Sequence, residues 1–195
     1  MHISPKFPRS LTFLISMTVL LGVVYPAFVT VIAQLAFPAK ANGSLIVQGG
    51  KVRGSSLLAQ KFERPSFFHA RPSATDYAYI GSGASNLGPT SADLAKSVAE
   101  RKAAWEAAYG APAPQEMLYA SGSGLDPDIS LEAALAQEGK VATARGLGEA
   151  SRQALAAAIN AAAAKAESLI GPKRVNVVEL NALLESDPRF KGTGE

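Results

Sequence analysis

An unbroken run of residues without a charge extends from Leu11 to Phe37, near the N-terminus. At about 1.5 Å of helical rise per residue, this run is longer than the roughly 30 Å hydrocarbon core of a bilayer. A helix of this length in the core of a water-soluble protein would need a polar face, and this run has none. The sequence therefore predicts a transmembrane helix over residues 11–37, preceded by an N-terminal tail of residues 1–10.

A cleaved signal peptide is the alternative for this apolar run. The apolar region of a signal peptide is about 7–15 residues long, which is much shorter than the run seen here. The tripeptide Ala39-Lys40-Ala41 nevertheless has the A-x-A pattern of a cleavage site. The length favours an uncleaved anchor.

The orientation of this anchor follows from what flanks it. Lys6 and Arg9 precede the run, whereas Lys40, Lys51 and Arg53 follow it, so the charge bias between the two flanks is nearly neutral. Long domains cross a membrane largely regardless of their charge. We therefore expect a single-pass protein of the cell inner membrane, with a cytoplasmic N-terminus and a periplasmic soluble domain.

Two small side chains lie four residues apart within the run, at Thr18 and Gly22. This spacing places them on one helix face, where small residues let a second helix approach closely. The alternative is that Thr and Gly are simply common in membrane helices. Pro26 lacks a backbone donor and is expected to kink the helix.

Residues 38–195 are predicted to form a small soluble domain of the α+β class. Ser44–Gln48 and Lys51–Arg53 are expected as strands, because Gly49-Gly50 between them is a hairpin turn signal. The other expected elements are a helix from an N-cap at Thr90 through Ala108, a short strand at Met117–Tyr119, a helix from Ser130 to about Gln137, an alanine-rich helix within Gly146–Leu169, and a strand or strand-to-helix segment at Val175–Leu184.

Composition narrows the classes of function. Hydrophobic residues make up 48% of the chain and charged residues 18%, which excludes a disordered, charge-rich protein. The 19 basic residues are scattered, so we expect no nucleic-acid partner. There is no cysteine, and the only histidines are His2 and His69, so no transition-metal site is expected.

Several segments come close to catalytic or binding motifs. His69 and Asp76 could form part of a hydrolase triad, but no G-x-S-x-G elbow accompanies them, and a structural role for His69 is favoured. The segment Gly83–Thr90 follows the P-loop spacing, yet a proline replaces its lysine. Ser121–Gly124 has the composition of an anion-binding nest, and Asp126 with Asp128 falls short of a calcium loop.

An ordered set of segments over nearly the whole chain resembles the C subunit of the Kdp potassium-transporting ATPases. The segments are Gly22–Pro26, Gln34, Phe37-Pro38, Ala41–Ile46, Gly54–Gln60, Phe67–Thr75, Ser85–Thr90, Ala120–Pro127 and Arg174–Asn181. This chain departs from the family pattern at Phe67, Ala70, Tyr79-Ile80 and the alanine-rich stretch Ala156–Ala164.

The resemblance implies an accessory subunit without catalytic residues. It implies two partners, a potassium-binding channel-like subunit and a P-type ATPase subunit, in addition to membrane lipid. It implies roles in assembly and, as a catalytic chaperone, in raising the ATP affinity of the ATPase subunit. No tightly bound cofactor is expected. ATP would be shared with the ATPase subunit, with Gln137, Ser121 and Gly122 as weak candidates for contact.

ATP is absent outside the membrane, so a periplasmic domain favours a structural or gating role at the outer mouth of the potassium pathway. The residues expected to contact partners are Thr18, Gly22, His69, Arg71 and Asn86. The five donors of Arg71 suit it to hold a carboxylate or several carbonyls. A membrane-anchored periplasmic hydrolase or binding protein is the alternative from another class.

Overall fold

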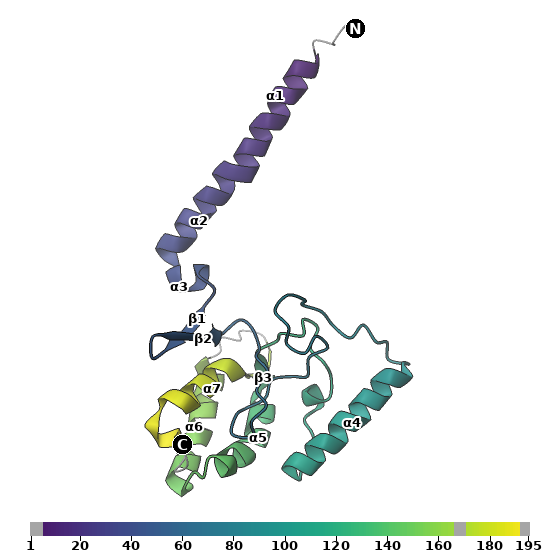
Figure 1. The fold of residues 1–195 in the computed structure, drawn as a ribbon, viewed down its shortest axis with the longest axis vertical. Helices are drawn as coiled ribbons and strands as arrows, with labels where there is room; N and C mark the ends of the chain where they lie inside the picture. The colour runs from purple at the N-terminus through teal and green to yellow at the C-terminus, as the bar shows by residue number, and fades with distance from the viewer. Residues whose placement is uncertain (1–5, 166–170, 192–195) are drawn as a thin grey trace. The chain divides into compact units, whose positions relative to one another are not determined.

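The computed structural model describes residues 6–165 and 171–191, and the chain divides into two compact units, Met1–Ser44 and Leu45–Glu195 (Figure 1). The predicted class is confirmed, since an apolar N-terminal helix is followed by a region of mixed helices and small sheets. His2 and the last residues of the predicted alanine-rich helix, 166–169, lie outside the described residues.

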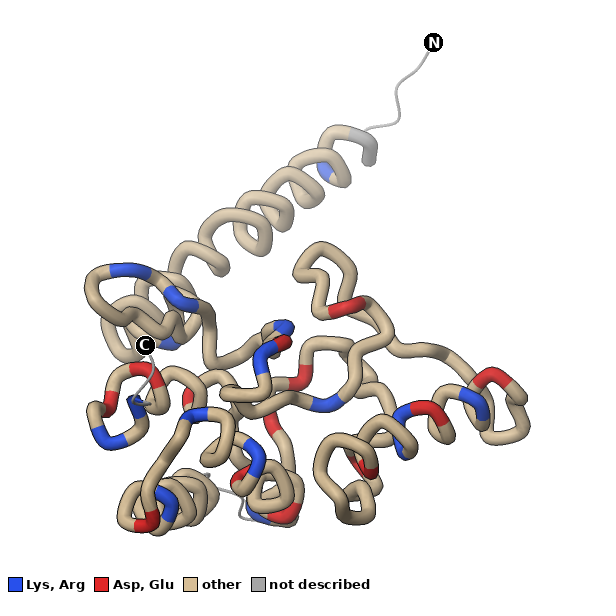
Figure 2. The backbone as a smooth tube through the Cα atoms, turned by 60° about the horizontal axis from the view of Figure 1, so that its bottom comes forward, with Lys and Arg blue, Asp and Glu red and all other residues tan. Residues whose placement is uncertain are grey.

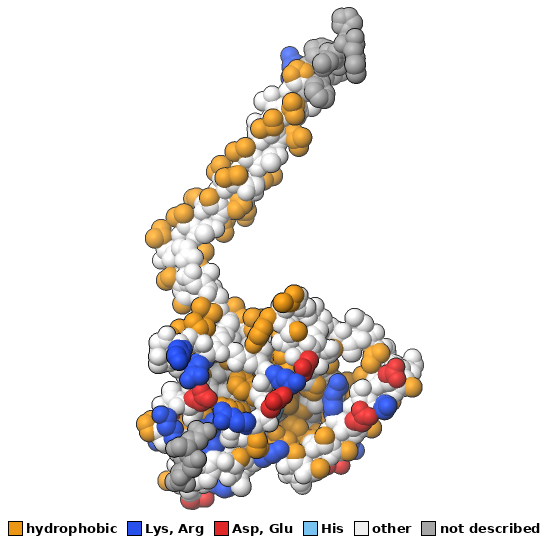
Figure 3. Space-filling view, in the orientation of Figure 1, with side chains coloured by type: hydrophobic (Ala, Val, Ile, Leu, Met, Phe, Trp, Pro, Cys, Tyr) orange, Lys and Arg blue, Asp and Glu red, His pale blue; other side chains and the backbone are white. Residues whose placement is uncertain are grey.

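The first unit is a helix that begins at Lys6, so residues 6–10 of the expected tail are helical. It consists of α1 (Lys6–Val19), a π-helical turn (Leu20–Val24) and α2 (Tyr25–Ala36), with a short α3 (Pro38–Ala41) after it. The stretch Pro8–Ala36 has a mean hydropathy of 2.1 and is long and apolar enough to cross a membrane. Hydrophobic side chains are spread along the whole of its visible face, and basic atoms appear there only near its N-terminal end (Figure 3).

The polar groups of this helix bond within it. The hydroxyls of Thr12, Thr18 and Thr30 each donate to the carbonyl four residues earlier, at 2.8 Å. Pro26 is the second residue of α2 and has no backbone N–H to donate, and the π-helical turn immediately precedes it. Such internal bonding is what a hydrocarbon environment requires.

In the second unit, the predicted hairpin is confirmed as β1 (Leu45–Gln48) and β2 (Lys51–Ser55). Gly49 and Gly50 have φ values of 57° and 74°, the left-handed conformations that a two-residue turn of this type demands. Gln48 fastens the hairpin to the domain by donating to the carbonyl of Ala182 at 2.6 Å. A second small antiparallel sheet pairs β3 (Asp128–Ser130) with β4 (Arg174–Asn176).

Four longer helices complete the domain: α4 (Ala92–Tyr109), α5 (Leu131–Ala144), α6 (Glu149–Lys165) and α7 (Val177–Ser186). The predicted start of the helix at Ser130 is confirmed: Ser130 is the N-cap of α5, because its hydroxyl accepts from the Ala133 N–H at 3.1 Å. The strand-to-helix alternative for the last segment is also confirmed, as β4 leads directly into α7.

Three expected boundaries are wrong. The N-cap of α4 is Ser91 and not Thr90, because the Ser91 hydroxyl reaches the Leu94 N–H. The helix from Ser130 continues beyond Gln137 to Ala144, since the alanines and Val141 after it pack into the core. The expected strand at Met117–Tyr119 is replaced by a 3₁₀ turn, Gln115–Met117, that buries the Met117 side chain.

The core of the domain lies between α5, α6, α7 and the β3–β4 pair, around Phe68, Leu155, Ile159 and Phe190. Phe68 arrives on a loop without a strand partner, so its buried backbone groups need other hydrogen bonds. Two buried amide side chains provide them, at Asn181 and Gln137. Asn181 accepts from the Phe68 N–H and donates to its carbonyl, both at 2.9 Å.

Gln137 repeats this arrangement on the next residue of the loop. Its Oε1 accepts from the His69 N–H at 2.8 Å and its Nε2 donates to the His69 carbonyl at 3.1 Å. Each amide thus imitates one rung of a β-ladder. We call these four hydrogen bonds the amide pair; they hold Phe68 and His69 against α5 and α7.

Replacing Gln137 by Met is expected to destabilise the protein by about 2 kcal/mol or more, because two backbone groups of His69 lose their partners in the interior. Urea unfolding of the full chain in neutral detergent measures this, with the fluorescence of the single tryptophan, the buried Trp105, as the signal. The same change at the exposed Gln153 on α6 is the matched control. Equal stability of the two variants would contradict the structural role of the amide pair.

His69 also makes stability depend on pH. Burial of its imidazole lowers its pKa below the ordinary histidine value of about 6.5, and the charge of Lys140 acts in the same direction. The unfolded chain therefore takes up the proton first, so this stability is present above about pH 6.5 and is lost as the pH falls toward the folded pKa. The unfolding midpoint is expected to be lower at pH 5 than at pH 7.

A His69→Gln variant should lose less stability than the parent over the same interval. Burial and the neighbouring Asp126 raise the pKa of Asp128, which acts in the opposite sense but equally in both proteins. An equal loss in both proteins would show that His69 is not the group that titrates.

Candidate functional site

Three loop segments, two of them close together in the sequence and the third further along the chain, meet on one side of the domain. They are the segment Phe67–Thr75, the glycine-rich segment Gly81–Pro89 and the segment Ser121–Pro127. Ser121 donates its N–H to the carbonyl of Pro72 at 2.9 Å, and Gly83 donates its N–H to the carbonyl of Ser123 at 2.8 Å. Ser82 adds a hydroxyl bond to the same Ser123 carbonyl at 3.0 Å.

Gly124 is required where these loops touch. Its φ of 69° lies in the left-handed region, and a Cβ on it would lie 2.6 Å from the Thr75 hydroxyl and 2.8 Å from the Gly83 carbonyl. No other residue fits at such a contact. The expected anion-binding nest at Ser121–Gly124 is therefore packed against two other loops on this side, while Gly122 itself remains exposed.

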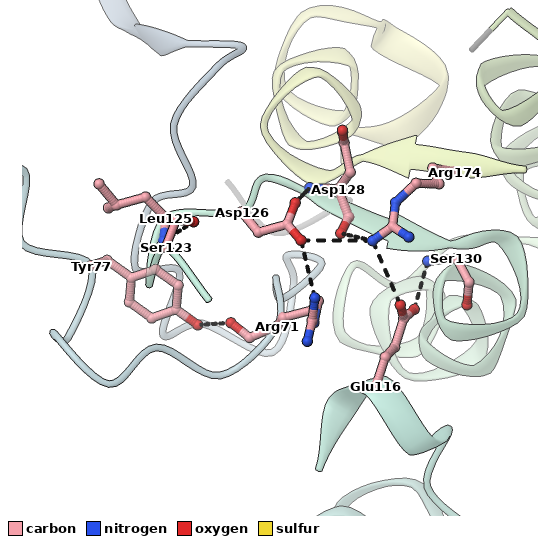
Figure 4. Close-up of polar contacts among 9 residues, drawn as sticks. All are labelled: Arg71, Tyr77, Glu116, Ser123, Leu125, Asp126, Asp128, Ser130 and Arg174. Carbon is pink, nitrogen blue, oxygen red and sulfur yellow. Dashed lines mark hydrogen bonds and ion pairs between the residues drawn. The ribbon is translucent and has the colours of Figure 1, made fainter. Parts of the chain in front are cut away.

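A half-buried group of charges fixes the base of the loops (Figure 4). Arg71 Nη1 donates to Asp126 Oδ2 at 3.2 Å, and Arg174 Nη2 lies 3.7 Å from the same oxygen. Arg174 also reaches Glu116 at 3.9 Å, and Glu116 accepts from the Ser130 N–H at 2.6 Å. This charge clamp, formed by Arg71, Asp126, Arg174 and Glu116, connects the first and third loops to β3 and β4.

Asp126 and Asp128, the two acidic residues that the sequence suggested for a cation, both bind other side chains of the domain. Asp126 faces two guanidinium groups, and Asp128 accepts from the Asn176 amide at 3.0 Å. Within residues 6–165 and 171–191, no three His, Cys, Asp or Glu side chains are grouped so that they could hold a metal ion. The arrangement is a brace, with each carboxylate opposed by a donor.

The expected site residues fall into two sets. Gln137 and Ser121 are interior, at 0% and 2% exposure, and His69 and Arg71 are half-buried. Thr18, Gly22, Asn86 and Gly122 are exposed. Both polar ends of the Gln137 amide are bonded to His69, so a nucleotide contact there would require breaking the amide pair; that contact stays a prediction. Asp76, weighed as a triad member, bonds to Lys61 at 2.9 Å.

Next to the second and third loops lies an exposed apolar surface that sequence reasoning missed. Leu57, Leu58 and Tyr79 line an open hollow of about 580 Å³, which Gly122 also borders. Ile80, next to Tyr79, is completely exposed. We call Leu57, Leu58, Tyr79 and Ile80 the apolar loop surface. The sequence did contain a sign of this surface: these large apolar residues lie near glycines and lack the periodicity of a strand or helix that would bury them.

Known proteins match this chain over nearly its whole length. The family described as "KdpC: K+-transporting ATPase, c chain" matches residues 7–186. A potassium-transporting ATPase KdpC subunit of Cereibacter sphaeroides is 45% identical over 186 residues, which cover 95% of this chain and 97% of the relative. The corresponding subunit of Pseudomonas syringae pv. tomato is 46% identical over 180 residues, which cover 92% of each chain.

A third relative, the potassium-transporting ATPase KdpC subunit of Pseudomonas putida KT2440, is 46% identical over 177 residues, which cover 90% of this chain and 93% of the relative. These matches include both the apolar helix and the domain that carries the three loops. The resemblance drawn from the ordered sequence segments is thereby confirmed, and the chain belongs to the KdpC family of potassium-transporting ATPase subunits.

Proposed function

We propose that this chain is an accessory subunit of an ATP-driven potassium uptake complex and that it acts in assembly of that complex. The observation that carries the proposal is the family match over residues 7–186, joined to relatives whose names assign them to a potassium-transporting ATPase. Among the described residues, one helix is long and apolar enough to cross a membrane, which supports a single-pass subunit. In this proposal the subunit is anchored in the cell inner membrane with its domain in the periplasm.

The apolar loop surface is the proposed contact with the other subunits. Monomeric soluble proteins rarely leave several large apolar side chains together in water, and such groups mark interaction sites. Here the loops beneath are held by the charge clamp, Gly124 and the backbone bonds to Ser123. Fixed loops lose little conformational entropy when a partner binds, which favours association.

The partners in this proposal are the channel-like potassium-binding subunit and the P-type ATPase subunit. A periplasmic domain fits a structural or gating role at the outer mouth of the potassium pathway, because ATP is not available there. A chaperone role, in which ATP is shared with the ATPase subunit through Gln137, Ser121 and Gly122, remains a finer alternative. Of these three candidate residues, Gly122 is the exposed one, and it borders the apolar loop surface.

Co-purification tests the proposal. The parent chain, expressed with the other subunits in potassium-starved cells, should bring them down from detergent-solubilised membranes. The double change Tyr79→Ser and Ile80→Asp should reduce recovery at least tenfold, because an interface centre contributes about 2 kcal/mol or more. Both side chains are exposed, so the fold should be preserved.

The matched control places the same acidic group on the exposed Ala104 of α4. Recovery should then equal that of the parent chain. Failure of the parent chain to recover any partner would overturn the accessory-subunit proposal, whereas normal recovery with the double variant would reject the apolar loop surface alone.

The membrane helix gives a second prediction. Gly22 is exposed, and a Cβ on it would meet nothing within 4 Å, so a larger side chain does not disturb the helix itself. If Thr18 and Gly22 face a partner helix, Gly22→Leu should prevent close approach and weaken association by about 1–2 kcal/mol. Recovery of the complex in detergent should fall while membrane insertion stays normal.

Ser16→Leu is the matched control, because Ser16 precedes Thr18 by two residues within α1 and so lies on the opposite helix face. It should leave recovery unchanged. Equal recovery of the complex with both variants would contradict the prediction that Thr18 and Gly22 face a partner helix.

A further inference from the structure

One face of the β1–β2 hairpin is apolar and exposed. Leu45 and Val47 alternate along β1 and so point to the same side, and Val52 of β2 is paired directly with Val47. These three side chains are 52%, 59% and 59% exposed. We call them the outer hairpin face. Adjoining apolar side chains that stay in water mark a contact with a protein or a membrane.

The opposite face of the hairpin is bonded to the domain. Ile46 is half-buried and lines a hollow of about 150 Å³ together with Val178 of α7. Gln48 donates to the Ala182 carbonyl, as described above. Because alternate residues of a strand point to opposite sides, fixing Ile46 and Gln48 keeps the outer hairpin face turned away from the core.

The chain around this face carries charges of one sign. All 16 acidic residues lie at Glu63 or beyond, whereas six basic residues precede it. Figure 2 accordingly shows basic but no acidic positions along the apolar helix and the hairpin. Glu185 borders the same hollow as Arg53. The exposed Lys51, next to the turn, forms no ion pair with any carboxylate of the described residues. Its charge is therefore available to an anion outside the chain.

A short connection joins the hairpin to the apolar helix. Only eight residues, Phe37 to Ser44, separate α2 from Leu45. Eight residues span at most about 28 Å when fully extended. Here they fold back on the helix end, because Ser44 donates its N–H to the Ala39 carbonyl at 2.9 Å and the amides of Gln34 and Asn42 exchange hydrogen bonds at 3.1 and 3.3 Å. A bilayer crossed by the helix is thus present at high effective concentration around the hairpin.

We propose that the outer hairpin face lies in the interfacial layer of the bilayer that the apolar helix crosses. Leu45, Val47 and Val52 contact the glycerol and first acyl groups, and Lys51 reaches an anionic headgroup, as apolar and basic side chains do in interfacial segments. A protein partner fits this face less well, because a standard interface takes roughly 20–30 residues from each side.

This contact restricts how the domain moves on its connection to the helix. A domain that is held at the membrane surface loses less orientational freedom when it binds a membrane-embedded partner. The inference rests on the membrane anchor of the proposed function and is independent of the assembly role.

The chain has no cysteine, so a single Val47→Cys substitution accepts one environment-sensitive fluorophore at a known place. The full chain is reconstituted in vesicles of phosphatidylglycerol and phosphatidylcholine that contain a lipid with a nitroxide near its headgroup. The nitroxide should quench the fluorophore at Val47. A fluorophore at Ala104→Cys, exposed on α4, should not be quenched. Leu45→Cys serves as a second labelling position on the same face if Val47→Cys does not fold.

The charge is tested in the Val47-labelled chain. Lys51→Gln should lower the ratio of lipid-contacting to free hairpin by about fivefold in phosphatidylglycerol vesicles, which is what one basic residue near an anionic surface contributes. Lys96→Gln removes the same charge from an exposed position of α4 and should leave the quenching unchanged. Val52→Asp should remove the quenching, whereas Ala104→Asp should retain it.

The outcomes separate this inference from the proposed function. A chain that alkaline washing removes from the vesicles would overturn the membrane anchor and this inference together. A chain that stays anchored, with no more quenching at Val47 than at Ala104, would overturn the inference alone. A label that becomes shielded only when the other subunits are reconstituted with the chain would assign the face to a protein partner and also overturn it.

Discussion

The amide pair is the constraint on which the domain depends. Phe68 fills the centre of the core from a loop that has no neighbouring strand, and backbone groups buried in this way need partners. Asn181 from α7 and Gln137 from α5 supply four hydrogen bonds to two consecutive residues. With Phe68 and His69 held in this way, the following residues reach the point where the three loops meet.

The same solution recurs across the domain because its sheets are so small. Each sheet has two short strands, which cannot order the long connections between them. Hydrogen bonds from side chains to backbone groups therefore order these connections instead of strand pairing. Arg145 joins three carbonyls, and the Tyr77 hydroxyl donates to the Arg71 carbonyl at 2.8 Å. The charge clamp adds ionic bonds at the base of the loops. Because these loops are fixed, the apolar side chains next to them stay exposed and are not covered by loop movement.

This construction separates residues that maintain the domain from residues that are available to a partner. Gln137, Arg71 and Asp126 are engaged within the domain, although their chemistry first suggests a binding site. The apolar loop surface is built from less distinctive residues, yet it remains open to solvent. For a family of transporter subunits, this distribution agrees with an accessory role, in which surfaces matter more than a reactive centre.

The sequence by itself determined the features that depend on neighbours along the chain. The uncharged length of the first helix, the Gly49-Gly50 hairpin, the Ser130 cap and membership of the family all follow from local patterns or from ordered motifs. Local chemistry decided even the strand-to-helix change after Asn176, whose side chain caps α7.

Only the tertiary structure decided what the polar and charged residues do. Gln137 and His69 are 68 positions apart, and Arg71 and Asp126 are 55 positions apart, so no local pattern connects either pair. The length of α5 beyond Gln137 and the 3₁₀ turn at Gln115–Met117 likewise depend on what the core can bury. Propensity and periodicity act over a few residues, whereas burial, hydrogen-bond satisfaction and local charge depend on which distant segments the fold brings together.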